Sequence, residues 1–198
     1  MRSELTLPRL PAIEPNDLLR INVVGNSGSG KSTFARQLAS ALNTKYIELD
    51  RLWHGPNWTE SEVDVFRERV RSALLDDRWV LDGNYHSKTH ELKWERATMI
   101  VWMETPFFRN LWQSITRAIY RAWTQKELWP GTGNRETFRK SFFSRDSIIL
   151  WALMSYHALQ KRYEAVSKNP QWKHIRFVRL RSKHDARQLL EIARKDTA

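Results

Sequence analysis

The chain contains no cysteine, and only seven of its 198 residues are glycine and seven are proline. The lack of cysteine excludes a disulfide framework, thiolate zinc sites and a cysteine nucleophile, and it fits a reducing compartment, so the cytoplasm is the expected location. With 41% hydrophobic and 28% charged residues, the composition excludes collagen-like, disordered and repeat chains. It predicts one globular domain that is large enough to bury a core.

Long apolar runs are also missing. The longest stretch without a charged residue covers residues 147–160, which is 14 residues, whereas a membrane-spanning helix needs about 20. The first twenty residues carry six charged side chains and three prolines, so they lack the apolar stretch of a signal peptide. We therefore expect neither a membrane span nor export.

Negative charge is scarce in the second half of the chain. The formal net charge of +11 divides as −1 over residues 1–104, +5 over residues 105–146 and +7 over residues 147–198. A local positive field attracts polyanions, which include both nucleic acids and the phosphates of a nucleotide. Charge alone does not choose between these partners, so the choice depends on motifs.

Short runs typical of strands alternate with segments of helical character. The expected strands cover residues 20–24, 45–49, 79–81, 98–103 and 174–180. Helices are expected to start near Lys31, Thr59, Lys88 and Pro106, and Thr59 and Glu62 have the spacing of a capping box. Because parallel strands need long helical crossovers, this alternation predicts an α/β fold whose parallel sheet is covered by helices on both faces.

Two segments lie outside this alternation. Residues 1–17 contain three prolines and no hydrophobic period, which predicts an irregular N-terminal arm before a single domain at residues 18–198. Residues 129–134 hold three glycine or proline residues between two arginine-bearing helical segments. They are expected to form the tip of a mobile flap.

The strongest motif follows the first expected strand. Residues 25–32 match the phosphate-binding pattern G-x-x-x-x-G-K-[ST] in full. The glycines let consecutive amides point inward, and the following helix adds the positive end of its dipole. The residues expected to bind ATP are Gly25, Asn26, Ser27, Gly28, Ser29, Gly30, Lys31, Ser32 and Thr33.

Polar side chains in this loop have separate expected roles. Lys31 supplies a compact positive charge for the β and γ phosphates, and the Ser32 hydroxyl is placed to ligate Mg²⁺. Thr33 is expected to reach the α phosphate. The motif therefore predicts ATP and Mg²⁺ as cofactors.

Further strings extend the similarity beyond the loop. The order of the loop, Asp50, Asp82 with Gly83, and then Arg117 and Arg121 resembles small-molecule and nucleoside monophosphate kinases typified by adenylate kinase. Over about residues 20–185 the chain is also similar to the bacterial DNA topology modulation proteins, which are themselves adenylate-kinase-like. The strings that carry this similarity lie at residues 48–50, 55–59, 79–85, 134–136 and 144–148. The resemblance implies a five-stranded parallel sheet of order 2-3-1-4-5, flanked by helices, with an arginine-rich helical lid over about residues 107–146.

Two acids follow expected strands. Asp82 stands where the kinases that the chain resembles place a carboxylate that orients Mg²⁺ through water. Asp50 ends the preceding strand and faces the acceptor side, where it could accept the proton of an attacking hydroxyl or help hold the metal. The structural alternatives are a helix cap for Asp82 and a solvated turn for Asp50.

The lid carries the remaining candidate catalytic residues. Arg117 and Arg121 are four residues apart on one helix face, with the spacing of the pair that brackets donor phosphates in the adenylate kinase lid. Arg135, Arg139 and Arg145 lie on the return side. Guanidinium groups on a closing lid suit phosphoryl transfer, which needs positioning and charge neutralisation. A solvated basic face is the alternative for any one of them.

The usual arginines for the acceptor phosphate are missing. Adenylate kinases follow the Asp-Gly pair with Phe-Pro-Arg, where this chain has Asn84, Tyr85 and His86, and Trp53 takes the place of a second arginine. Either other arginines replace them, or the acceptor is a hydroxylated metabolite, as in the shikimate and gluconate kinases.

Tryptophan is abundant, with ten residues in the chain. Trp53 and Trp58 fit either the core or a substrate pocket. Trp102, Trp112 and Trp151 sit in apolar surroundings, so they are expected in the core.

Together the motifs predict an ATP- and Mg²⁺-dependent phosphotransferase that acts on a small-molecule acceptor, with nucleosides and nucleotides among the candidates. The expected partners are a nucleotide and this acceptor, and no membrane. The alternative is a nucleic-acid-binding or regulatory P-loop NTPase linked to DNA topology. It is not favoured, because the sequence has no helix-turn-helix or zinc-finger pattern.

Overall fold

Five parallel strands form a single sheet in the order β2-β3-β1-β4-β5. The computed structural model describes residues 10–136 and 148–197, and side chains are described for all of these except residues 148–155. The strands are β1 (Arg20–Gly25), β2 (Lys45–Glu48), β3 (Trp79–Asp82), β4 (Met99–Met103) and β5 (Arg176–Leu180). The predicted α/β fold and its strand order are confirmed.

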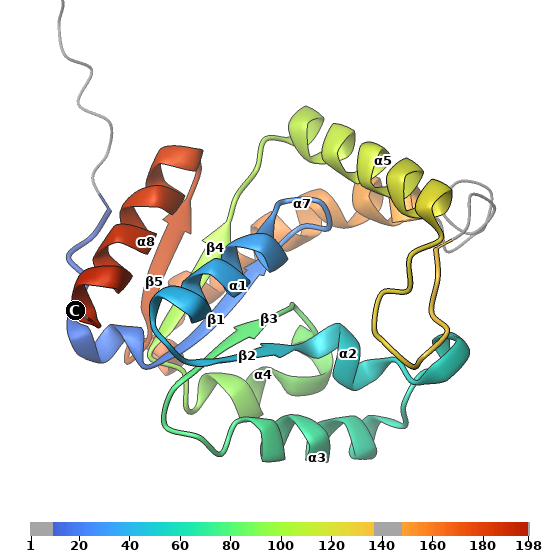
Figure 1. Ribbon diagram of the computed structural model, residues 1–198. Coiled ribbons are helices and arrows are strands. Elements are labelled where there is room, and N and C mark those ends of the chain that lie inside the picture. Colours follow the sequence, from blue (N-terminus) through green and yellow to red (C-terminus); the bar gives the residue numbers. More distant parts are fainter. Residues whose placement is uncertain (1–9, 137–147, 198) are drawn as a thin grey trace, which may run out of the picture.

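Helices cover both faces of the sheet (Figure 1). On one face, α1 (Lys31–Ala41) and α8 (Lys183–Asp196) pack against each other and the strands. The other face is covered by α2 (Leu49–Trp53), α3 (Val63–Ala73), α4 (His86–Trp94) and α7 (Ile148–Ser167). Among the described residues one further α-helix, α5 (Phe107–Thr124), lies beyond the sheet and contacts α7.

Alternation along the strands divides the core into two layers. Val23 and Val80 face α1 and α8, while their neighbours Val24 and Leu81 belong to the opposite cluster. All four side chains are fully buried. Continuous apolar runs are typical of parallel strands that are covered on both faces, which is why short runs sufficed to predict them.

The structure corrects the predicted start of α3 and describes only part of the predicted N-terminal arm. The predicted capping box is wrong, because α3 begins at Val63 with Glu62 as its N-cap residue. The Thr59 hydroxyl instead donates to the carbonyl oxygen of Pro56 at 2.7 Å and closes a 3-10 turn (Pro56–Trp58). Of the expected irregular arm, only residues 10–17 lie in the described part, and a 3-10 turn (Pro15–Leu18) begins there.

Within residues 10–136 and 148–197, no helix combines the length and the apolar character that crossing a bilayer requires.

Trp102 is buried as expected, with 2% of its surface exposed, and Trp53 joins the same core cluster. The Trp151 side chain lies outside the described residues.

A buried polar network ties the phosphate-binding loop to the end of β3. The Asn84 amide donates to the carbonyl oxygen of Gly25 at 2.9 Å, and its oxygen accepts from the Gly25 N–H at 3.1 Å. The Tyr163 hydroxyl donates to the same amide oxygen, and the Lys93 ammonium donates to the Asn84 carbonyl. Lys93 is fully buried, and burial lowers its pKa to about 7.

Lys93 should make the folded protein more stable as pH rises from 7 towards 10. The unfolded chain keeps the lysine proton up to a pKa of 10.5, but the folded chain releases it near 7. Since the unfolded state binds more protons in this window, raising the pH favours folding, by at most about 1.4 kcal/mol per pH unit. Urea unfolding at pH 7, 8 and 9 measures the slope, which Lys93→Met should flatten.

Lys45→Met is the matched control, because Lys45 is exposed and pairs with Asp76 at 2.9 Å. It should keep the slope of the unaltered chain. An unchanged slope in Lys93→Met would show that Lys93 keeps its proton in the fold.

Candidate active site

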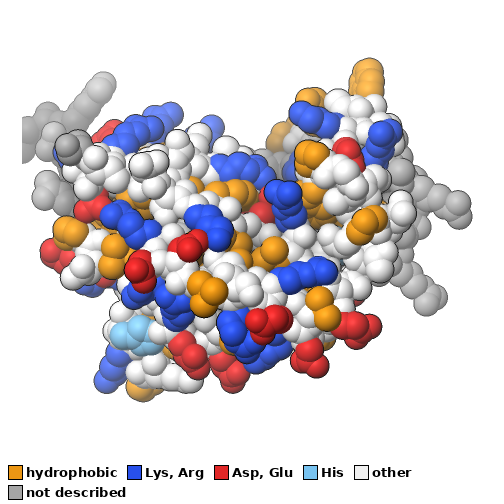
Figure 2. Space-filling view, turned by 60° about the horizontal axis from the view of Figure 1, so that its bottom comes forward, with side chains coloured by type: hydrophobic (Ala, Val, Ile, Leu, Met, Phe, Trp, Pro, Cys, Tyr) orange, Lys and Arg blue, Asp and Glu red, His pale blue; other side chains and the backbone are white. Residues whose placement is uncertain are grey.

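A cavity of about 620 Å³ opens at the carboxyl edge of the sheet. The space-filling view shows a hollow between the main body and the projecting part that carries α5 (Figure 2). Open parallel sheets bind ligands at this edge. The predicted site residues that line the cavity are Ser27, Gly28, Gly30, Lys31, Ser32, Thr33, Asp50, Arg117 and Arg121.

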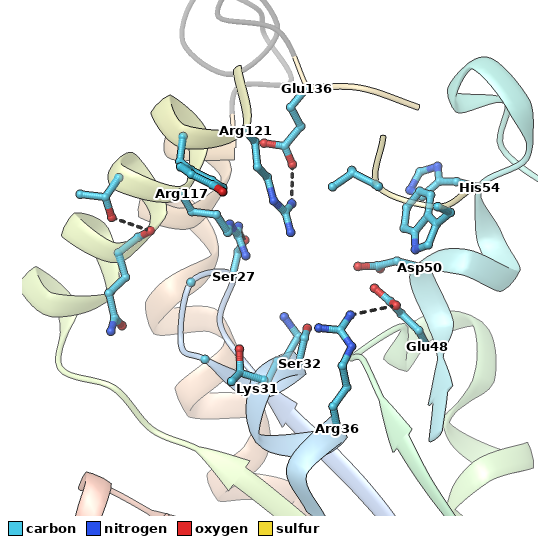
Figure 3. Close-up of a pocket in the computed structure, with 18 of the residues that line it drawn as sticks. Ser27, Lys31, Ser32, Arg36, Glu48, Asp50, His54, Arg117, Arg121 and Glu136 are labelled. Atoms are coloured by element: carbon cyan, nitrogen blue, oxygen red, sulfur yellow. Dashed lines mark hydrogen bonds and ion pairs between the residues drawn. The ribbon is translucent and has the colours of Figure 1, made fainter. Parts of the chain in front are cut away.

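The phosphate-binding loop joins β1 to α1 and leaves helical amides available. Gly30 is the N-cap residue of α1 and offers no side-chain hydrogen bond to the first turn. The first N–H groups of a helix have no partner within the helix, and together with the helix dipole they attract anions. Lys31 and Ser32 follow at once and point into the same space (Figure 3).

One helix holds the tip of this loop through buried polar side chains. From α5, the Asn110 amide donates to the Ser27 carbonyl oxygen at 2.7 Å, and the Ser114 hydroxyl donates to it at 3.0 Å. Gly28 has φ +83°, and a Cβ there would lie 2.3 Å from the Ser114 hydroxyl oxygen. Helix and loop approach so closely that only glycine fits at position 28.

Sequence reasoning did not single out Asn110 and Ser114. The signal was present, because small or polar residues recur every four positions at 110, 114, 118 and 122, and all four are buried. Such a stripe favours close packing of a helix face. The expectation that Trp112 lies in the core is wrong, since this residue is 67% exposed on α5.

Arg117 and Arg121 both reach the cavity from α5 (Figure 3). The Arg117 guanidinium donates to the Ser27 hydroxyl oxygen at 2.6 Å, and Arg121 pairs with Glu136 at 2.7 Å. Burial, and secondly the neighbouring Arg121 charge, lowers the pKa of Arg117. Two neighbouring guanidinium groups, of which Arg117 forms no ion pair with a described acid, suit a site for a polyanion.

Of the three other predicted arginines, the structure describes only Arg135. Arg135 is exposed and does not line the cavity. Arg139 and Arg145 lie outside the described residues. In the basic region around the last strand, Arg179 and Arg181 pair with Glu104 rather than lining the cavity.

Asp82 lies behind the cavity wall at the end of β3 and is 3% exposed. One carboxylate oxygen accepts a hydrogen bond of 2.9 Å from the Tyr46 hydroxyl. The other is buried and has no hydrogen-bond partner among the described residues. A carboxylate oxygen left without a partner suits a hydrated Mg²⁺ ion, which takes hard oxygen ligands and keeps several waters.

Asp50 stands on the opposite side of the cavity from Lys31 (Figure 3). It was expected to end a strand, but β2 ends at Glu48 and Asp50 lies in the first turn of α2. The Tyr85 hydroxyl hydrogen-bonds to Asp50, and burial together with this negative charge raises the pKa of Tyr85.

An aromatic wall closes the same side. The rings of His54 and Trp129 stack with centroids 5.9 Å apart, and Trp58 meets Trp129 edge-on at 5.9 Å. All three side chains line the cavity. Burial lowers the pKa of His54, so its imidazole is neutral at pH 7. The sequence allowed either the core or a substrate pocket for Trp53 and Trp58. In the structure Trp53 lies in the core and Trp58 lines the cavity.

The segment after α5 is joined to the loop after α2. The Asn134 side chain is fully buried, accepts from the Trp58 N–H at 2.6 Å and donates to the Gly55 carbonyl oxygen at 2.9 Å. The Asn57 N–H donates to the Thr132 carbonyl oxygen at 3.0 Å. The predicted flap tip therefore forms part of the cavity wall in this structure.

A scan of protein-family models finds no match, and neither does a search of curated proteins. Solved structures do match. A shikimate kinase from Acinetobacter baumannii, in complex with shikimate, has a TM-score of 0.51 and 18% identity over 88% of this chain and 90% of that chain. A gluconokinase from Sinorhizobium meliloti has a TM-score of 0.49 and 17% identity over 90% and 91%. At 18% sequence identity, the similarity to the shikimate kinase concerns the fold alone, and it shows that the chain has the P-loop kinase fold.

Asn134→Ala should loosen the cavity wall at the loop after α2. The variant removes the hydrogen bonds of Asn134 with the Trp58 N–H and the Gly55 carbonyl oxygen, and loss of buried hydrogen bonds costs about 1–3 kcal/mol. Amide hydrogen exchange at Trp58 should accelerate by about tenfold or more. Asn134→Asp keeps the oxygen that accepts from Trp58 and should retain more protection, whereas two variants with unaltered exchange would contradict this account.

Proposed function

We propose that the protein is an ATP- and Mg²⁺-dependent phosphotransferase that acts on a small-molecule acceptor. The observation that carries the proposal is the shared cavity, in which the phosphate-binding loop and the α5 arginines face Asp50. Donor phosphates and an acceptor hydroxyl need this opposed arrangement, because phosphoryl transfer depends mainly on positioning and on neutralising charge.

The donor side would hold the triphosphate along residues 25–33. The loop and the first turn of α1 supply N–H groups, and Lys31 supplies a compact charge. Arg117 is already held over Ser27 by its hydrogen bond. Arg121 would contribute a second guanidinium from the next turn of α5.

Mg²⁺ would be held by the Ser32 hydroxyl and, through water, by Asp82. The unpartnered oxygen of Asp82 fits this role. When bound, the ion would neutralise charge on the β and γ phosphates. Tyr46 would fix the carboxylate through its hydrogen bond to the other oxygen.

Asp50 would accept the proton of the attacking hydroxyl. It lines the cavity, and the Tyr85 hydroxyl holds its side chain. The lid arginines would stabilise the negative charge of the transferred group. Arg139 and Arg145, which lie outside the described residues, keep their predicted role of contacting phosphate, whereas Arg135 is exposed and does not line the cavity.

Lys31→Ala should weaken ATP binding at least tenfold and abolish turnover, because it removes the charge beside the phosphates without changing the core. Isothermal calorimetry with ATP and Mg²⁺ measures the affinity, and circular dichroism checks the fold. Lys45→Ala, on the exposed start of β2, should bind ATP like the unaltered chain. Equal binding by both variants would remove the loop from the site.

Arg117→Ala should lower the affinity for ATP at least tenfold while leaving the affinity for adenosine unchanged, because Arg117 would contact phosphate. Arg109→Ala is the matched control, since Arg109 is an exposed arginine on the same helix and does not line the cavity. Duplex DNA binding at low salt depends on total charge, so the two variants should reduce it equally. A loss confined to DNA binding would favour the nucleic-acid-binding NTPase.

A further inference from the structure

The two sides of the cavity differ in the cations that they offer to a ligand. On the donor side, Lys31 and Arg117 line the cavity and neither forms an ion pair with a described acid. The other lining cations, Arg36 on α1 and Arg121 on α5, are each paired with an acid. Arg36 lies 3.3 Å from Glu48, and Arg121 lies 2.7 Å from Glu136.

Asp50 is left as a carboxylate without a paired cation among the described residues. Its charge acts on His54, which lines the same side of the cavity, and on Arg117, which reaches the cavity from α5. The nearby Lys88 does not line the cavity, and its ammonium lies 3.3 Å from the ring centre of Trp53. The described lining residues from α2, from the loop after it and from the segment after α5 therefore contribute negative charge and no lysine or arginine, so an anion held against them would meet repulsion.

The aromatic wall formed by His54, Trp58 and Trp129 offers a binding surface for the ring of an acceptor. Trp129 is 7% exposed and its ring is fixed between His54 and Trp58. Fixed aromatic faces bind flat or ring-shaped ligands at little entropic cost. A neutral imidazole and a carboxylate beside them accept hydrogen bonds from hydroxyl groups.

We propose that the phosphoryl acceptor is a hydroxylated ring compound that carries no phosphate or carboxylate group. Its ring lies against Trp129 and Trp58, and its reacting hydroxyl points to Asp50. In the reaction the hydroxyl oxygen forms a bond to the γ phosphorus, the bond between that phosphorus and the β–γ bridging oxygen breaks, Asp50 takes the hydroxyl proton, and ADP leaves. This inference rests on the proposed function.

Matched pairs of compounds that differ by one anionic group test it. Glucose is compared with gluconate, and uridine with uridine monophosphate. Calorimetry in saturating ADP and Mg²⁺ measures binding to the acceptor side, and mass spectrometry after incubation with ATP and Mg²⁺ detects phosphorylated products. In at least one pair the uncharged member should bind tenfold or more tightly than its anionic partner, and it alone should be phosphorylated.

Equal binding within both pairs, preference for an anionic member, or no binding by any member would overturn the inference. The proposed function is tested separately, because ATP binding by the unaltered chain and its loss in Lys31→Ala are measured without an acceptor. ATP binding together with a preference for anionic acceptors would refute the acceptor class and leave the kinase proposal in place.

Substitutions of lining residues test which side chains cause the difference in affinity between the uncharged and the anionic member of a pair. Asp50→Asn keeps the size of the side chain but removes its charge, so the difference in affinity within a pair should shrink at least threefold. Glu60→Gln is the control, because Glu60 is exposed and does not line the cavity. Trp129→Leu should weaken the binding of both members, whereas Trp112→Leu, on the exposed side of α5, should not. Unaltered discrimination in Asp50→Asn would overturn the electrostatic argument.

Discussion

The hydrogen bonds from α5 to the Ser27 carbonyl determine how the rest of the site is arranged. Asn110 and Ser114 hold this carbonyl at the tip of the phosphate-binding loop, and the absence of a side chain at Gly28 lets the helix lie directly against the loop. Because a helix turns every 3.6 residues, Arg117 and Arg121 then face the cavity from the next turns. The chain that leaves α5 is directed to the loop after α2, where Asn134 joins it to Trp58 and Gly55.

This arrangement also separates charge within the cavity. The positive side is built from the loop, the start of α1 and α5, where Lys31 and Arg117 line the cavity and form no ion pair with a described acid. The opposite side is built from α2 and the segment after α5, whose described lining residues include Asp50 and Glu136 and no lysine or arginine. A nucleotide triphosphate and an uncharged acceptor would each meet a complementary surface.

Several features follow from short stretches of sequence. The loop could be recognised because eight consecutive residues carry its glycines, lysine and serine. The strands could be found because buried parallel strands are continuous apolar runs, and the strand order followed from the resemblance to known kinases. One prediction was wrong because a side chain had two possible hydrogen-bond partners close in sequence. Thr59 matches a capping box in spacing, but its hydroxyl closes the preceding turn instead.

The sequence by itself determined the fold class, the nucleotide loop and the identity of the side chains that could act there. Only the tertiary structure decided which of them meet. Asn110 reaches Ser27 across 83 positions of the chain, and Trp58 reaches Asn134 across 76. Local propensity carries no information about such contacts, because they depend on how α5 packs as a whole. The phosphate-binding loop could be predicted because its hydrogen-bond donors are neighbours in sequence. The aromatic wall could not, because it is built from segments that become neighbours only in the folded chain.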